Sequence, residues 1–85
     1  SEDRSFHAVS AQLVSFWQFY TLDAACQLKL FDFFPATTEF LSKNIFLPVT
    51  STEKLLSALV EMGYITQISG VWHLLTKGKF LTTDH

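Results

Sequence analysis

The sequence predicts a mainly α-helical domain with a small β-hairpin, an α+β fold of the winged helix-turn-helix type. Three observations in the 85-residue chain carry this prediction. A capped amphipathic helix runs into a stop at Gly63, two short strand-like runs flank Ser69-Gly70, and Thr76-Lys77-Gly78 closes the hairpin. Winged helices bind mainly DNA or protein, so the charges and apolar surfaces must decide between the two.

The first predicted element is a long helical region over residues 5–31, within a single domain that spans residues 1–85. No Pro or Gly occurs from Phe6 to Phe31, and apolar residues recur there at helical spacing. Around positions 13–20 the apolar residues cover roughly 220° of the helix circumference, at about 100° per residue. Ser15 and Gln18 mark the narrow polar face that remains.

An apolar arc this wide has two explanations. Either one side packs on the domain and the other on something else, or the domain wraps the helix completely. Because so short a chain has few residues for wrapping, we favour an outside protein partner. The predicted protein-interface residues are Leu13, Phe16, Trp17, Phe19 and Tyr20.

A turn at Pro35 separates this region from a second predicted helix over residues 38–44. Thr37 or Thr38 can cap this helix, and Phe40 and Leu41 are expected to face inward.

The third predicted helix covers residues 51–62, and the hairpin, or wing, covers residues 64–75. Thr50 and Glu53 have the spacing of a capping box at the start of this helix. Gly63 follows its end, where a left-handed residue is wanted. Its expected inward stripe consists of Leu55, Leu56, Leu59 and Val60.

Charge disfavours a nucleic-acid partner. The net charge is −2, and the six Lys and Arg residues are scattered along the chain. The third helix carries Glu53, Lys54 and Glu61, and the hairpin turn over residues 67–70 has no basic residue. Phosphate contacts supply much of the affinity of DNA readers. A winged-helix DNA-binding transcriptional regulator therefore stands as the alternative hypothesis.

No motif indicates catalysis, a cofactor or a metal. The three histidines lie far apart, and no His, Cys, Asp or Glu set has metal-ligand spacing. His73 is interpreted as an ordinary strand residue, and Cys26, among apolar neighbours, as a small buried side chain. Three glycines cannot form a phosphate loop. We therefore expect a chain that is not itself an enzyme.

The sequence also predicts a cytoplasmic protein without a membrane partner. A single cysteine cannot form an internal disulfide. No run approaches the roughly 20 apolar residues of a membrane span, and the first ten residues lack the pattern of a signal peptide. The small size favours a domain excised from a longer chain.

The order of these features resembles the N-terminal winged-helix dimerisation domain of small-molecule O-methyltransferases that use S-adenosylmethionine. Residues 24–34, AACQLKLFDFF, are similar to that family's A-x-x-L-G-L-F-D-x-L helix end, with Lys29 where the family usually has Gly. Residues 55–65 are similar to its L-x-R-L-L-R-x-L-x-x-x-G-L-L run without the arginines. Residues 72–81, WHLLTKGKFL, match Y-x-L-T-x-x-G-x-x-L with one residue fewer between Thr and Gly.

The resemblance implies a non-catalytic interaction or dimerisation domain. In that family the domain exchanges helices between protomers, while cofactor and catalytic residues lie in a following domain that this chain does not contain. Similar domains also stand beside catalytic domains in polyketide and peptide synthases. The expected partners are a second copy, a neighbouring catalytic domain or a carrier protein, with the aromatic first helix as the contact surface.

Overall fold

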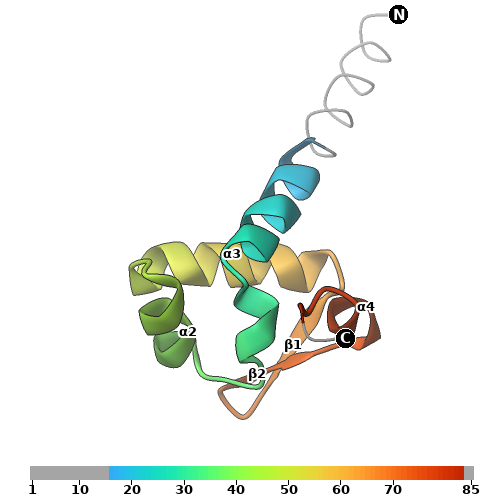
Figure 1. Cartoon of the computed structure of the whole chain (residues 1–85). Coiled ribbons are helices and arrows are strands. Elements are labelled where there is room, and N and C mark those ends of the chain that lie inside the picture. The colour runs from blue at the N-terminus through green and yellow to red at the C-terminus, as the bar shows by residue number, and fades with distance from the viewer. Residues whose placement is uncertain (1–15, 84–85) are drawn as a thin grey trace, which may run out of the picture.

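The computed structural model of the chain describes residues 16–83, and its elements follow the predicted order (Figure 1). Residues 16–27 form a helix, called here the N-terminal helix. The later elements are η1 (Leu30–Phe33), α2 (Thr38–Ile45), α3 (Val49–Glu61), β1 (Ile65–Ile68), β2 (Val71–Leu74) and α4 (Thr76–Lys79). The predicted mainly helical fold with one antiparallel two-stranded hairpin is confirmed.

The helical region predicted over residues 5–31 is interrupted within its described part. Its helix ends at Gln27, and Lys29 adopts the left-handed conformation with φ 58° and ψ 31°. The backbone N–H of Lys29 donates to the carbonyl of Cys26 over 3.0 Å, which closes the turn before η1 begins. A left-handed backbone suits glycine best. Lys29 occupies the position at which the family that the sequence resembles usually has Gly.

The 3-10 helix η1 lies at the centre of the core. Leu30 is fully buried and Phe31 is 1% exposed. The ring of Phe31 stacks on Phe34 and meets the edge of Tyr64, with ring centroids 6.2 Å apart in each pair. The buried apolar core around them consists of Ala25, Leu30, Phe31, Ala36, Leu41, Ile45, Leu56, Leu59 and Ile65.

Helix α2 begins as predicted, but one of its two expected core residues faces outward. Thr37 is the N-cap, and its hydroxyl accepts a hydrogen bond from the backbone N–H of Phe40 over 3.2 Å. Leu41 and Ile45 are buried, one helical turn apart. Phe40, one position before Leu41, is turned away by about 100° and is half-exposed, so its inward assignment is wrong.

Helix α3 begins at Val49, two residues before the predicted start, and the expected capping box is absent. Pro48 is the N-cap and no side chain caps the helix. Because Pro48 has φ −58°, the helix can start directly after it, which places Thr50 inside the first turn. The carbonyl of Pro48 accepts hydrogen bonds from the backbone N–H of Thr52 and from its hydroxyl, over 2.9 and 3.0 Å.

The buried stripe of α3 differs in part from the predicted one. Leu56 and Leu59 are fully buried, and Thr52 joins them because its hydroxyl is satisfied by the Pro48 carbonyl. Leu55 is half-buried, whereas Val60 is largely exposed and does not belong to the core.

Gly63 ends helix α3 as predicted. Its φ is +80°, its N–H donates to the Val60 carbonyl, and the N–H of Tyr64 donates to the Leu59 carbonyl, each over 3.0 Å. These two bonds form a Schellman motif. They turn the chain directly from α3 into strand β1.

The hairpin has the predicted turn, and its second strand also forms an isolated bridge with the body. Ile68 lies opposite Val71, and the turn residues Ser69 and Gly70 both have positive φ, as a type I′ turn requires. On the other side of β2, Ala36 and Trp72 exchange two backbone hydrogen bonds, of 3.1 and 2.7 Å. The hairpin is thereby attached to the segment between η1 and α2.

The short helix α4 packs on the start of the hairpin, and the chain after it returns to η1. Gly78 is buried against the backbone carbonyl of Tyr64. Beyond α4, the carboxylate of Asp32 accepts hydrogen bonds from the backbone N–H of Thr83, over 2.8 Å, and from its hydroxyl.

Candidate protein-interaction surface

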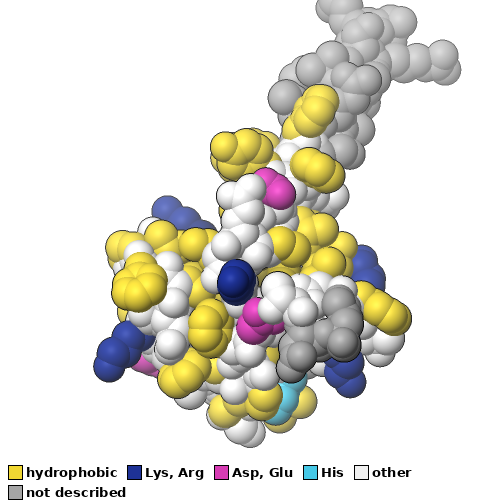
Figure 2. Space-filling view, viewed as in Figure 1, with side chains coloured by type: hydrophobic (Ala, Val, Ile, Leu, Met, Phe, Trp, Pro, Cys, Tyr) yellow, Lys and Arg dark blue, Asp and Glu magenta, His cyan; other side chains and the backbone are white. Residues whose placement is uncertain are grey.

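The described start of the N-terminal helix projects from the body and carries an exposed aromatic surface, formed by Phe16, Trp17, Phe19 and Tyr20. In Figure 1 this helix rises away from the layer that α2, α3 and the hairpin form. The four side chains are 71%, 70%, 74% and 73% exposed. Figure 2 shows hydrophobic side chains gathered where this helix leaves the body. Four of the five predicted interface residues thus lie on one exposed surface, and Leu13 lies outside the described residues.

In its first described turns, this helix has the reverse orientation of an ordinary surface helix. Ala25, on the same helix, is fully buried in the core. At 3.6 residues per turn, Gln18 lies almost directly above Ala25, whereas Phe16 and Tyr20 lie about 180° and 140° away from it. The polar side chain therefore points along the side that faces the body, and the broad apolar arc faces outward. A surface helix normally has the opposite arrangement.

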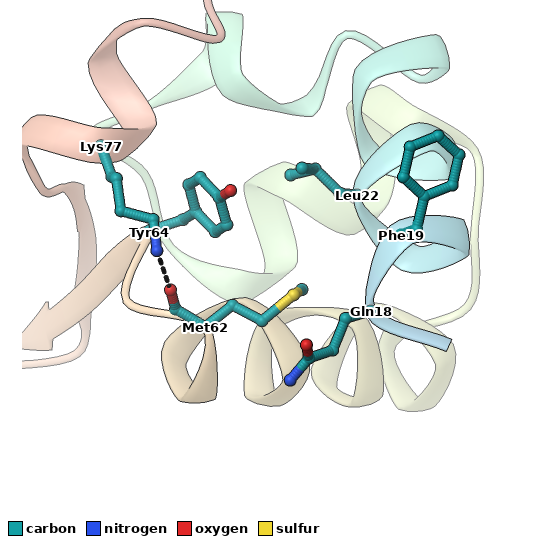
Figure 3. Close-up of a pocket in the computed structure, with 6 residues that line it drawn as sticks. All are labelled: Gln18, Phe19, Leu22, Met62, Tyr64 and Lys77. Carbon is teal, nitrogen blue, oxygen red and sulfur yellow. Dashed lines mark hydrogen bonds between the residues drawn. The ribbon is translucent and has the colours of Figure 1, made fainter. Parts of the chain in front are cut away.

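Two hollows flank the projecting helix, one on each side. The first, of about 380 Å³, lies between the helix, the end of α3 and α4, and Figure 3 shows its lining side chains. It is lined by Gln18, Phe19, Leu22, Met62, Tyr64 and Lys77. The second, of about 250 Å³, is lined by Trp17, Gln18, Thr21, Ala58, Glu61 and Met62. Gln18 and Met62 belong to both hollows, so the helix crosses the end of α3 at these two residues.

Lys77 forms a fixed wall of the first hollow. Its Nζ donates a hydrogen bond to the backbone carbonyl of Met62 over 2.7 Å and lies 4.5 Å from the centroid of the Tyr64 ring (Figure 3). The positive charge therefore lies at the C-terminus of α3, where it is favourable, and over an aromatic face.

The faces that a DNA reader would use carry few cations. Glu53, Lys54 and Glu61 are exposed on α3, and the exposed hairpin residues 67–70 are uncharged. Lys77, in α4, is engaged with Met62 and Tyr64. The charged side chains of α3 are therefore two carboxylates and one ammonium.

Cys26 is half-buried against the core rather than fully buried. Desolvation by burial, and secondly the charge of Asp23, raise the pKa of its thiol above the usual value. A raised pKa keeps the sulfur protonated and poorly nucleophilic.

Other candidate groups for chemistry do not gather in the part of the chain that the structure describes. His73 lies in β2 opposite Thr66, and His7 and His85 lie outside the described residues. Within residues 16–83, no three His, Cys, Asp or Glu side chains are placed to hold a metal ion. Over the same residues, no helix is both long enough and apolar enough to cross a bilayer.

The sequence did not reveal the residues of the body that lie beside the aromatic surface. These residues are Met62 at the end of α3, Tyr64 directly after Gly63, and Lys77 in α4. Each has an ordinary role in local structure. Their position beside Gln18 depends on the angle at which the N-terminal helix leaves the body. The helix ends just before the left-handed turn at Lys29, and Ala25 packs it on the core.

Comparison with known proteins places this fold among methyltransferases. The sequence matches no protein-family model and no curated protein. The chain is similar in structure to part of PigF, in a complex with SAH, with 36% identity and a TM-score of 0.80 over 93% of this chain. It is also similar to NcsB1, an O-methyltransferase from neocarzinostatin biosynthesis in complex with S-adenosylmethionine and 2-hydroxy-5-methyl naphthoic acid, with 26% identity and a TM-score of 0.72 over 78% of this chain.

Human N-acetylserotonin methyltransferase has the same fold over 99% of this chain, with a TM-score of 0.81 and 22% identity. In all three comparisons the chain spans only about a quarter of the other protein: 28% of PigF, 22% of NcsB1 and 27% of the human enzyme. The similarity therefore concerns one part of each of these proteins.

Proposed function

We propose that this chain is a non-catalytic winged-helix domain of a protein of the S-adenosylmethionine-dependent O-methyltransferase type, and that it mediates self-association through the exposed aromatic surface. The observation that carries the proposal is the outward orientation of the N-terminal helix. Phe16 and Tyr20 face away from the body, whereas Gln18 lies on the body side. Trp17 and Phe19 lie on the two flanks of the helix, and both remain exposed.

An unpartnered surface of this size is costly in water. A large aromatic side chain can bury about 150–250 Å². At roughly 70% exposure, the four aromatic residues together expose on the order of 400–700 Å². The largest apolar patch of a typical monomer, which is often functional, covers about 300–600 Å². Burial against a second copy would remove most of this area from water.

The order of elements supports the winged-helix assignment. The strand-like bridge at Ala36 precedes α2 and α3, and the hairpin follows them directly. The structural similarity to PigF and NcsB1 supports a methyltransferase association. Because the chain spans about a quarter of those proteins, we assign no residue of methyl transfer or cofactor binding to it. We also propose a cytoplasmic location, which the lone, half-buried Cys26 supports.

The decisive experiment compares the association state of three proteins by analytical ultracentrifugation over a wide concentration range. The native chain should dimerise, and the double variant Phe16→Ser, Tyr20→Ser should shift the dimer Kd upward by at least 100-fold. Phe46→Ser is the matched control, because Phe46 is 90% exposed at the end of α2, away from the N-terminal helix. It should leave the Kd unchanged.

Two outcomes would contradict the proposal. One is a native chain that stays monomeric at millimolar concentration and does not bind the neighbouring domains of its parent protein. The other is salt-dependent DNA binding with a steep slope, which would favour the transcriptional regulator instead. Titration with S-adenosylmethionine should show no binding to this chain.

A further inference from the structure

We infer that the carboxylate of Asp32 closes a strap, residues 80–83, over η1, and that loss of this one carboxylate opens the strap without unfolding the domain. The strap shares no residue with the aromatic surface, so this inference goes beyond the proposed self-association. It rests on the proposed function in one respect: in a longer protein, a held Thr83 would give the chain that follows a fixed starting direction.

The clamp between Asp32 and Thr83 has two points of attachment. One carboxylate oxygen of Asp32 accepts the backbone N–H of Thr83 over 2.8 Å, and the other accepts the hydroxyl of the same residue. Hydrogen bonds to an ionised acceptor are stronger than those between neutral groups. The two residues are 51 positions apart, so the clamp is a tertiary contact. In Figure 1 the chain that follows α4 lies beside η1, in agreement with these bonds.

The fixed half of the clamp is η1. Asp32 follows Phe31, which is 1% exposed, and the backbone N–H of Asp32 donates to the Lys29 carbonyl over 3.1 Å. Because the core anchors the backbone on this side, the carboxylate is held in place independently of the strap. It accepts two donors from one residue, an N–H and a hydroxyl, which only a serine or threonine can present in this way.

The other printed hydrogen bonds of the strap lead back to α4 rather than to η1. The N–H of Leu81 donates to the Gly78 carbonyl over 3.0 Å. The Thr82 hydroxyl donates to the Lys79 carbonyl over 3.2 Å. Phe80 is 72% exposed, whereas Leu81 is half-buried against the core. A segment with exposed hydrogen bonds and little buried apolar surface opens more readily than the core, so closure of the strap depends mainly on the clamp.

Amide hydrogen exchange of the ¹⁵N-labelled chain, followed by NMR, tests the clamp directly. In the native chain, the Thr83 amide should exchange at least about tenfold more slowly than the same amide in an unstructured peptide. Asp32→Ala should bring this rate to within about twofold of the peptide rate. The amide of Leu59, a fully buried residue of α3, should keep its protection in this variant.

Two substitutions at Thr83 provide a test that leaves the core and the charge of Asp32 untouched. Thr83→Val removes the hydroxyl bond and keeps the backbone bond. The protection of its amide, relative to a matching peptide, should therefore fall between that of the native chain and that of Asp32→Ala. Thr83→Ser keeps both bonds and should behave as the native chain does.

Asp23→Ala is the matched control for removal of a carboxylate. Asp23 is exposed on the N-terminal helix, where it accepts a hydrogen bond from the Gln27 side chain over 2.9 Å. This variant removes the same charge and a similar surface contact, but it should leave the exchange rate of the Thr83 amide unchanged.

Three results would overturn the inference. A native Thr83 amide that exchanges at the peptide rate would show that the strap is open. Full protection in both Asp32→Ala and Thr83→Val would show that other contacts hold it. Loss of protection at Leu59 together with Thr83 in Asp32→Ala would show that the carboxylate supports the whole domain. None of these results depends on dimerisation, so ultracentrifugation can contradict the proposed function while the strap stands, and the reverse.

Discussion

The indole N–H of Trp72 donates a hydrogen bond to the hydroxyl of Thr38 over 2.9 Å, across 34 positions of the chain. Trp72 lies in β2 and Thr38 is the first residue of α2. The backbone of Trp72 also exchanges two hydrogen bonds with Ala36, just before that helix. One residue thus attaches the hairpin to the helical body by both its backbone and its side chain.

Trp72→Phe should lower the free energy of unfolding by about 1–2 kcal/mol, because it removes the indole donor and part of the packed ring. Chemical denaturation followed by circular dichroism measures the change. Thr38→Val removes the same bond from the other side, and the double variant should lose less than the sum of the two single losses. Strict additivity would show that this bond does not contribute to stability.

Gly78→Ala should be among the most destabilising changes in the chain, by about 2–3 kcal/mol or more, since overpacking a tight contact forces the backbone to move. A Cβ at this position would clash with the backbone carbonyl of Tyr64, which has no freedom to rotate away. Thermal melting of the purified variant tests this expectation.

Gly70→Ala is the matched control for that clash. A Cβ at Gly70 meets no atom within 4 Å, and only the positive φ of +81° opposes it. Its cost should be about 1 kcal/mol. Equal losses for the two alanine variants would mean that the contact with Tyr64 is not what requires glycine at position 78.

The sequence predicted those elements whose signals are local. The type I′ turn at Ser69-Gly70 and the glycine stop at Gly63 need particular backbone conformations, and glycine reports them directly. The start of α3 was misplaced because Thr50 and Glu53 imitate a capping box, whereas Pro48 allows the helix to begin earlier. Phe40 was assigned to the core by its apolar character alone, although the turn of the helix gives the core to Leu41 and Ile45.

The sequence predicted the aromatic surface of the N-terminal helix but not the hollows beside it. The width of the apolar arc around Phe16 and Tyr20 already indicated an outside partner, and their exposure agrees with that expectation. The hollows on either side could not be predicted, because Met62 and Gln18 lie 44 positions apart in the sequence and meet through the packing of two helices. No periodicity within a single element contains that information.

Lys29→Gly should raise the free energy of unfolding by about 1 kcal/mol, because it relieves a non-glycine residue held at φ 58°. Part of the gain is offset by the greater freedom of glycine in the unfolded chain. Lys43→Gly is the control for loss of a lysine side chain. Lys43 lies inside helix α2, where glycine should instead cost about 1 kcal/mol. Opposite signs in urea denaturation are expected, and a loss of stability in both variants would contradict the assigned strain.

The thiol of Cys26 should react slowly with iodoacetamide near pH 8.5, and unfolding in urea should accelerate the reaction. Burial, and to a smaller extent the charge of Asp23, raise its pKa in the folded chain, so less of the reactive thiolate is present than in the unfolded chain.

The raised pKa of Cys26 also makes the stability of the folded chain depend on pH. The folded state holds the proton more tightly, so its stability is constant below the usual cysteine pKa and falls as the pH rises through that value toward the raised one. Asp23→Asn should increase the alkylation rate of the folded protein modestly, whereas Glu61→Gln, on α3, should leave it unchanged. If the folded and unfolded chains reacted equally fast, Cys26 would be as accessible and as acidic as a free thiol, and its assignment as an inert packing residue would be wrong.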